Sequence, residues 1–197
     1  MRLNETEKTL KKRIEFTEVM SCIKPEQLIF LDESGANLKM SMVYGRGYPG
    51  QRIIEASPFN RGTKLTLISA ISIRKVEAAL YGEWSVNGLI FTQFLEYCLI
   101  PQLKAGDIVC YDNVSFHKVA DAQKLIESVG ARLIYLPPYS PDLNPIEMMW
   151  SKIKIYLKKQ AARTLETFQK AIKIAFESIT SQDLKGWYKH CGYGSTI

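Results

Sequence analysis

The apolar residues of the chain follow two periodicities, and together these predict a mixed α/β fold. Four runs are continuously apolar or alternate with polar residues, as strands do: 27–33, 64–73, 107–111 and 131–136. The run 64–73 is also rich in β-branched side chains. A further run, 76–81, follows closely enough to be a hairpin partner. Apolar residues at helical spacing mark 86–103, 118–129, 145–160 and 165–180, before a short C-terminal helix.

The remaining segments give weaker patterns. Residues 1–26 read as one or two polar helices ended by Pro25, a lead-in that packs on a main domain of residues 27–197. We expect Ser34–Gly35 to turn the chain after the first strand. Two short strands, Leu38–Tyr44 and Arg52–Glu55, are expected on either side of a Gly/Pro turn.

The order of these elements indicates the architecture. Antiparallel strands come first, and strand–helix–strand units follow, whose crossovers should be parallel and right-handed. The prediction is a mixed sheet covered by helices on both faces. Ligands of such sheets gather at the carboxyl ends of the parallel strands, so polar residues that follow those strands are the candidates for chemistry.

Three carboxylates occupy such positions. Asp32, with Glu33 beside it, ends the first apolar run, and Asp112 follows the run 107–111. The third, Glu147, follows the stretch LIYLPPYSPDLNP, whose prolines stiffen the loop. Asn144 is a good N-cap and Pro145 suits the first helical position, so Glu147 falls in the first turn of a helix.

Two of the acids also have a structural reading. Asn144 with Glu147 three residues later resembles a capping box, and Asp32 could be a turn carboxylate. If the three acids instead meet at one edge of the sheet, they repel one another, and a hard divalent cation removes that cost. Oxygen ligands favour Mg²⁺ or Mn²⁺ over zinc, and two such ions could act on a phosphodiester.

Composition narrows the class of protein. The 197 residues suffice for one domain with a sizeable core, and 46% hydrophobic with 23% charged residues is typical of soluble globular proteins. Four well-separated cysteines without a CxxC pair argue against a zinc site or a disulfide scaffold and fit the cytoplasm. No apolar run approaches the ~20 residues of a membrane helix, so no membrane partner is expected.

The net charge of +6 is concentrated at one end of the chain. Residues 148–197 hold nine Lys and Arg against three Asp and Glu, which equals the whole excess. A basic region beside candidate acids suggests a polyanionic substrate, although a solvated helix face explains the charge equally well. Lys152, Lys154, Lys158 and Lys159, on the helix that carries Glu147, are the candidates for phosphate contact.

Three motifs carry a resemblance to a known family. LIFLDES, VCYDNVSFHK and YLPPYSPDLNPIEMMWSKIK resemble the DDE catalytic domain of the mariner-like transposases of bacterial insertion sequences. The likeness covers roughly residues 27 to 192 and includes the terminal HCGY. The 34 residues between Asp112 and Glu147 also match the spacing in that superfamily. The resemblance implies an RNase H-like fold with strand order 3-2-1-4-5, and metal-dependent cutting at transposon ends with joining of the freed 3′-hydroxyl to target DNA.

The resemblance also implies roles for individual residues. Asp32, Asp112 and Glu147 would be the three metal ligands of the motifs, binding Mg²⁺ or Mn²⁺, two ions in all. Glu33 and Asn113 would support them from a second layer. His117 matches the second motif, with a contact to the loop backbone or to DNA both open. Trp150, one helical turn after Glu147, is expected to pack in the core.

The resemblance implies partners and leaves rival functions. DNA would be the substrate, on which the chain would act as a homodimer, and a separate or frameshift-fused N-terminal segment would supply the helix-turn-helix modules that full-length relatives carry. The alternatives are an RNase H-like nuclease that does not transpose, and an inactive remnant that binds DNA. The remnant predicts loss of a motif acid, yet all three are present.

Overall fold

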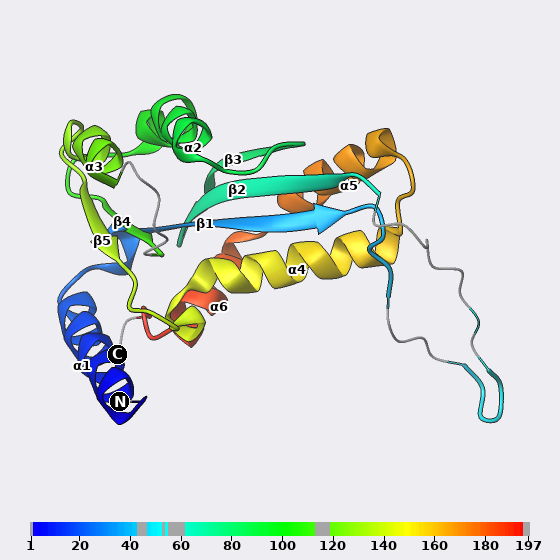
Figure 1. The fold of residues 1–197 in the computed structure, drawn as a ribbon, viewed down its shortest axis with the longest axis horizontal. Helices are drawn as coiled ribbons and strands as arrows, with labels where there is room; N and C mark the ends of the chain where they lie inside the picture. Colours follow the sequence, from blue (N-terminus) through cyan, green and yellow to red (C-terminus); the bar gives the residue numbers. More distant parts are fainter. Residues whose placement is uncertain (1, 43–46, 53, 55–61, 113–118, 195–197) are drawn as a thin grey trace.

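The computed structural model describes residues 2–42, 47–52, 54, 62–112 and 119–194. Five strands are seen there: β1 (Leu28–Asn37), β2 (Lys64–Ser72), β3 (Val76–Gly82), β4 (Ile108–Tyr111) and β5 (Arg132–Tyr135). The α-helices of this part are α1 (Arg2–Ser21), α2 (Gly88–Phe94), α3 (Val119–Glu127), α4 (Pro145–Gln160), α5 (Leu165–Glu177) and α6 (Ser181–His190) (Figure 1). None of the helices in these ranges is long and apolar enough to cross a membrane.

The strands form one mixed sheet in the order β3-β2-β1-β4-β5. β1, β2 and β3 pair antiparallel, whereas β4 is parallel to both β1 and β5. This confirms the order 3-2-1-4-5, the hairpin of β2 and β3, and the parallel second half. The parallel pairing of β1 with β4 is short, running from Leu28 opposite Ile108 to Leu31 opposite Tyr111.

Helices cover both faces of the sheet because neighbouring strand residues point to opposite sides. On β1, Phe30 belongs to a core that includes α4, α5 and α6, and Leu31 belongs to a second core under α2 and α3. The first core also takes in Phe16 and Met20 of α1, both less than 8% exposed. Figure 1 shows α4 lying along β1, with α2 and α3 on the other side of the sheet.

The first strand is longer than its apolar run predicts. Ser34 and Gly35 were expected to turn the chain, but β1 continues through them to Asn37. The reason is the antiparallel neighbour, since β2 pairs with β1 as far as Asn37 opposite Lys64. Ser34 is buried by this pairing, so a small polar residue before glycine did not mark a turn here.

Other boundaries differ in smaller ways. α1 ends at Ser21, and Pro25 begins the 3₁₀ turn Pro25–Gln27 rather than ending the helix. The helix expected over 86–103 begins as α2 but continues as a π-helical turn, Leu95–Leu99, and a 3₁₀ turn, Ile100–Gln102.

The two strands expected between residues 38 and 55 are not found where the structure describes this segment, residues 38–42, 51–52 and 54. The rest of both segments lies outside the described residues. A short, loosely alternating run is a weak strand signal, which explains why the described residues of these two segments form no strand. The Gly/Pro turn between them is confirmed, since Gln51 N–H donates to the Tyr48 carbonyl across it.

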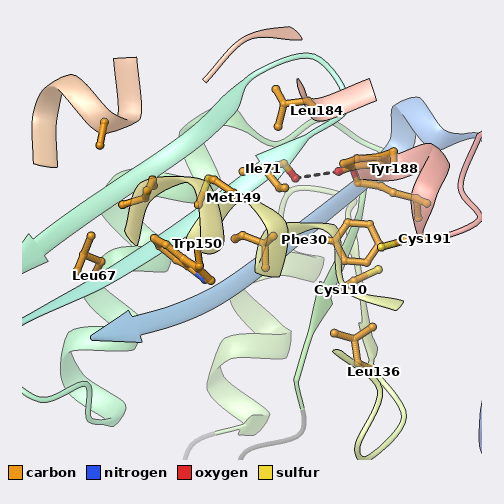
Figure 2. Packing of buried hydrophobic residues seen from close by; sticks show 14 of the residues in the cluster. Phe30, Leu67, Ile71, Cys110, Leu136, Met149, Trp150, Leu184, Tyr188 and Cys191 are labelled. Carbon is orange, nitrogen blue, oxygen red and sulfur yellow. Dashed lines mark hydrogen bonds between the residues drawn. The ribbon is translucent and has the colours of Figure 1, made fainter. Parts of the chain in front are cut away.

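One buried tyrosine fastens α6 to the middle of the sheet. Tyr188, fully buried, has its hydroxyl 3.0 Å from the Leu28 carbonyl of β1 and 3.0 Å from the Ile71 carbonyl of β2. Figure 2 shows it beside Phe30 and Cys191, with its bond to Ile71 dashed. The Phe30 and Tyr188 rings meet edge to face, 5.4 Å between centroids. The C-terminal helix is therefore part of the core.

We predict that Tyr188→Phe lowers the free energy of unfolding by about 1–2 kcal/mol, because two buried carbonyls lose their shared donor while the ring still packs. Urea unfolding at pH 7 measures this change. Tyr97→Phe is the matched control, since Tyr97 is 70% exposed, and should stay within about 0.5 kcal/mol of the parent protein. Equal stability of Tyr188→Phe and the parent would show that the hydroxyl is not a structural donor.

Candidate functional site

The register of β1 and β4 places two acids side by side. The last parallel pair is Leu31 with Tyr111, and the next residue on each strand is Asp32 and Asp112. Neighbouring strands are about 4.8 Å apart, so the two acids lie side by side just beyond the parallel pairing, although β2 still pairs with β1 at Asp32. Alternation along each strand puts both side chains on the face of Phe30 and α4. The strands bearing Asp32 and Asp112 are therefore neighbours, as the predicted order 3-2-1-4-5 requires.

The third acid arrives through a loop and a helix start. After β5 the chain passes a 3₁₀ turn, Pro141–Leu143, and enters α4 with Asn144 as N-cap and Pro145 in its first turn. Glu147 lies in that first turn and is exposed. Within the described residues the Asn144 side chain makes no capping bond, so the capping-box reading of Asn144 and Glu147 is wrong. The Glu147 carboxylate is not used to start the helix.

A cavity of about 360 Å³ joins the three acids. Its walls are Asp32 in the middle of β1, the residue that follows β4, the proline-rich loop and the first turn of α4. The lining residues are Asp32, Asp112, Leu136, Pro137, Pro138, Tyr139, Ser140, Pro141, Asn144 and Glu147. Acids from three distant parts of the sequence therefore open into one space, at the edge of the sheet where the pattern predicted a site.

The electrostatics of Asp32 reflect this crowding. Burial raises its pKa to about 7, with the negative charge of Glu147 adding to the effect and hydrogen bonds opposing it. One of those bonds comes from the Trp150 indole, whose Nε1–H donates to Asp32 Oδ2 at 3.1 Å. Trp150 is 2% exposed, so its predicted core packing is confirmed, but its polar edge holds Asp32 as well. The sequence pattern did not reveal this second role.

The donor set suits a hard divalent cation, because the carboxylate oxygens of Asp32, Asp112 and Glu147 are the ligands that Mg²⁺ and Mn²⁺ prefer. Asn144 adds a further oxygen, since its Oδ1 is buried and has no hydrogen-bond partner among the described residues. In the same part of the chain, no three His, Cys, Asp or Glu side chains are close enough to form a finished metal site. An ion would have to draw the carboxylates together.

Of the residues expected to support the acids, the structure describes Glu33. Glu33 points to the opposite face of the sheet from Asp32, where it accepts a hydrogen bond from the Tyr111 hydroxyl at 3.1 Å. Burial raises the pKa of Glu33, and the tyrosine bond opposes that shift. Glu33 is therefore not brought into the cavity with Asp32. Asn113 and His117 lie outside the described residues.

The four candidate lysines divide between two sides of α4. At 100° per residue, Lys154 and Lys158 lie within about 20° of Glu147 and continue its line along the helix. Lys152 and Lys159 lie roughly 120–140° around the helix. Lys152 Nζ already contacts Asp183 Oδ2 at 2.6 Å and the Ser178 carbonyl at 3.1 Å. The structure gives Lys152 a role in holding α4 to α6.

The turn ahead of α4 is held from both ends of the chain. Arg13 of α1 donates two hydrogen bonds to the carboxylate of Asp142, with N–O distances of 2.9 and 2.6 Å. The Tyr193 hydroxyl, in the terminal HCGY, donates to the Leu143 carbonyl at 2.6 Å. Both contacts hold the turn that leads directly into Asn144, so they fix the start of the helix that bears Glu147. Sequence reasoning missed them because they join residues 50 to 129 positions apart.

Comparisons with known proteins agree with this arrangement. Residues 27–169 match the family model described as DDE superfamily endonuclease. A search of curated proteins gives no match. The fold resembles a Mos1 transposase paired-end complex with the left transposon end, at a TM-score of 0.76 and 19% identity over 94% of this chain and 62% of that one.

Two further solved structures give the same picture. The Mos1 mariner paired end complex with Mn has a TM-score of 0.74 and 19% identity, over 95% of this chain and 60% of that one. The Mos1 transposase catalytic domain with Raltegravir and Mn has a TM-score of 0.69 and 17% identity, over 95% of this chain and 91% of that one. This chain thus spans less than two thirds of the longer Mos1 chains. At these identities the likeness establishes the RNase H-like fold.

We predict a pH-dependent loss of stability for Asp183→Asn. Burial raises the pKa of Asp183, but hydrogen bonds from Lys152 and Thr180 outweigh it and lower the pKa to about 2. Because the folded state holds this proton more weakly than the unfolded state, the ionised carboxylate stabilises the fold above about pH 4. Substitution should cost about 1 kcal/mol at pH 7, and the difference should shrink as the pH falls from 4 toward 2.

Urea unfolding at pH 7, 4 and 2.5 tests this. The control is Glu177→Gln, which removes an exposed ion pair to Lys173 at 4.0 Å and should change stability by less than about 0.5 kcal/mol. A deficit of Asp183→Asn that stays constant over the whole pH range would contradict the assignment of its effect to the carboxylate charge.

Proposed function

The chain belongs to the DDE superfamily endonuclease family, and from this premise we propose that it is the catalytic domain of a transposase. It would cut DNA at transposon ends in a metal-dependent reaction and transfer the freed 3′-hydroxyl to target DNA. The observation that supports the proposal most is the sharing of one cavity by Asp32, Asp112 and Glu147. An enzyme of this kind would work in the cytoplasm, where it meets the DNA.

The three carboxylates would hold the metal in this proposal, as two Mg²⁺ or Mn²⁺ ions. When bound, such ions activate a water or a 3′-hydroxyl as nucleophile and stabilise the leaving oxygen of the phosphodiester. Trp150 would keep Asp32 oriented through its indole N–H, and the buried Asn144 Oδ1 could accept a hydrogen bond from a water in the cavity. The Mos1 paired end complexes with Mn and with Mg support the choice of metals.

The DNA would run along the stripe of α4 that begins at Glu147. Lys154 and Lys158 continue this stripe away from the cavity and would contact phosphates on one side of the scissile bond. Lys159 lies on the other flank and is exposed, so we assign it a weaker contact. Lys152 would have to give up its ion pair with Asp183 to reach a phosphate, so we assign it the weakest phosphate contact of the four lysines.

The wider assembly is also part of the proposal. Mos1 transposase forms a paired-end complex with the left transposon end, and we infer that this chain acts as a homodimer on paired ends. End recognition would come from an N-terminal DNA-binding segment, encoded separately or joined by a frameshift. The alternatives are a nuclease of the same fold that does not transpose and an inactive remnant, and the intact set of three acids disfavours the remnant.

We predict that Asp32→Asn, Asp112→Asn and Glu147→Gln each reduce nicking of supercoiled plasmid by at least roughly 100-fold in Mg²⁺ or Mn²⁺, because each removes a charged oxygen ligand. Asp121→Asn, an exposed acid of α3 outside the cavity, is the matched control and should keep the parent rate. Nicking without divalent metal, or nicking that survives Asp112→Asn, would refute the chemistry. Joining of a 3′-hydroxyl oligonucleotide to the plasmid separates a transposase from a simple nuclease.

We predict that the double variant Lys154→Gln/Lys158→Gln binds a 30-base-pair duplex more weakly and with a smaller salt dependence. Each lost phosphate contact should reduce the slope of log affinity against log salt by about 0.9. The control is Lys170→Gln/Lys173→Gln on α5, which removes the same charge from residues paired with Glu166 and Glu177. Equal slopes for both double variants would mean that net charge, not the α4 stripe, attracts the DNA.

A further inference from the structure

The rim of the carboxylate cavity carries an aromatic side chain that the proposed chemistry does not use. Tyr139 lines the cavity together with Asp32, Asp112 and Glu147, yet it is 92% exposed. It is the most exposed of the large hydrophobic side chains in the described residues. Burial of its ring contributes nothing to the fold, so packing does not explain an aromatic residue at this position.

The backbone of Tyr139 is also unfavourable for a large side chain. Its φ is +55°, in the left-handed region, where an L-residue crowds its Cβ against the following carbonyl. Glycine and asparagine adopt this conformation more readily than tyrosine. In the described part of the chain only Ala161, the C-cap of α4, shares a positive φ among residues other than glycine. The fold therefore tolerates a strained tyrosine where a smaller residue would serve the turn better.

The neighbours of Tyr139 hold this conformation in place. The Ser140 hydroxyl donates to the Pro138 carbonyl at 3.1 Å, which bridges the residues on either side of the tyrosine. Ser140 is 6% exposed and Pro137 is buried, so both sides of the turn are anchored. Pro141 then leads into the 3₁₀ turn that Arg13 and Tyr193 secure. A rigid mount thus presents one free aromatic ring at the mouth of the cavity.

We propose that Tyr139 is a substrate-positioning residue whose ring stacks on a nucleobase next to the phosphate held in the cavity. This inference rests on the proposed DNA substrate and adds a contact to it. A phosphodiester that reaches the three carboxylates brings its own nucleosides to the rim, and any base offers a flat face to an aromatic ring regardless of sequence. The turn that carries the ring is already held in place, so stacking would order only the tyrosine side chain and would cost little backbone entropy.

Plasmid nicking in Mn²⁺ tests the proposal through substitutions at one exposed position. Tyr139→Ala and Tyr139→Leu should raise the half-saturating plasmid concentration roughly tenfold, with a smaller effect on the rate at saturation. Tyr139→Phe keeps the ring and should stay within about twofold. If Tyr139→Phe is as defective as Tyr139→Ala, the hydroxyl contacts the DNA and stacking is refuted. If Tyr139→Ala binds and nicks like the parent protein, the positioning role is refuted.

A base-stacking signal gives a readout that a merely structural role would not change. The probe is a 30-base-pair duplex with one nick and 2-aminopurine beside it, bound to protein carrying Asp112→Asn so that the DNA stays intact. Protein with the native Tyr139 and protein with Tyr139→Phe should quench the fluorescence to the same extent, while Tyr139→Ala and Tyr139→Leu should not quench it. The 2-aminopurine is placed in turn at each position beside the nick. Equal quenching by all four proteins at every one of these positions overturns the proposal.

The strain at Tyr139 supplies the internal control. Tyr139→Gly should raise Tm by about 2–4 °C, because glycine relieves the left-handed backbone, while it impairs DNA binding as much as alanine does. Reduced DNA binding together with reduced stability in all variants would indicate a structural residue and refute the inference. If the parent protein neither binds nor nicks DNA in Mn²⁺, the proposed function itself fails, whereas an active parent with an unaffected Tyr139→Ala rejects only the stacking.

Discussion

The parallel pairing of β1 with β4 is the constraint on which the candidate site depends. It lasts for only four residue pairs, and its last pair, Leu31 with Tyr111, fixes both the position and the facing of Asp32 and Asp112. A shift of one residue on either strand would send one acid to the other face of the sheet. Glu33 shows that outcome, since it is adjacent to Asp32 yet reaches the opposite face and Tyr111. The apolar cores on both faces therefore protect the site by fixing this register.

The negative charges of Asp32 and Glu147 lie close enough to repel each other, which costs the fold free energy. Asp32 is half-buried within reach of the negative charge of Glu147, and both burial and that charge raise its pKa because they disfavour the ionised form. Trp150 offsets part of that cost from inside the core. One helix thus supplies both an acid and the donor that steadies its neighbour, because Glu147 and Trp150 are three residues apart on α4. The arrangement suits a site made to receive positive charge.

Much of this could be predicted from the pattern of the chain, because the relevant signals are local. The buried strands, the N-cap and proline of α4, and the acids that follow the apolar runs are all set by residues only a few positions away. The extension of β1 past Ser34 and Gly35 could not be predicted, since it depends on the partner strand β2. Nor could the bonds of Lys152 to Asp183, Arg13 to Asp142 and Trp150 to Asp32, which join distant residues. Nothing in the sequence pattern distinguished Tyr139 from the other residues of the proline-rich loop.

The turn Pro141–Leu143 is held by two contacts, one from Arg13 and one from Tyr193, both distant from it in the sequence. Arg13 and Asp142 are partly exposed, with side-chain exposures of 29% and 59%, so dissolved ions can screen their attraction. Tyr193 holds the same turn through an uncharged bond that salt leaves intact. High ionic strength would therefore loosen one of the two anchors and keep the other. The mobility of the loop that carries Tyr139 and leads to Glu147 should thus respond to the electrolyte while the sheet beneath it stays rigid.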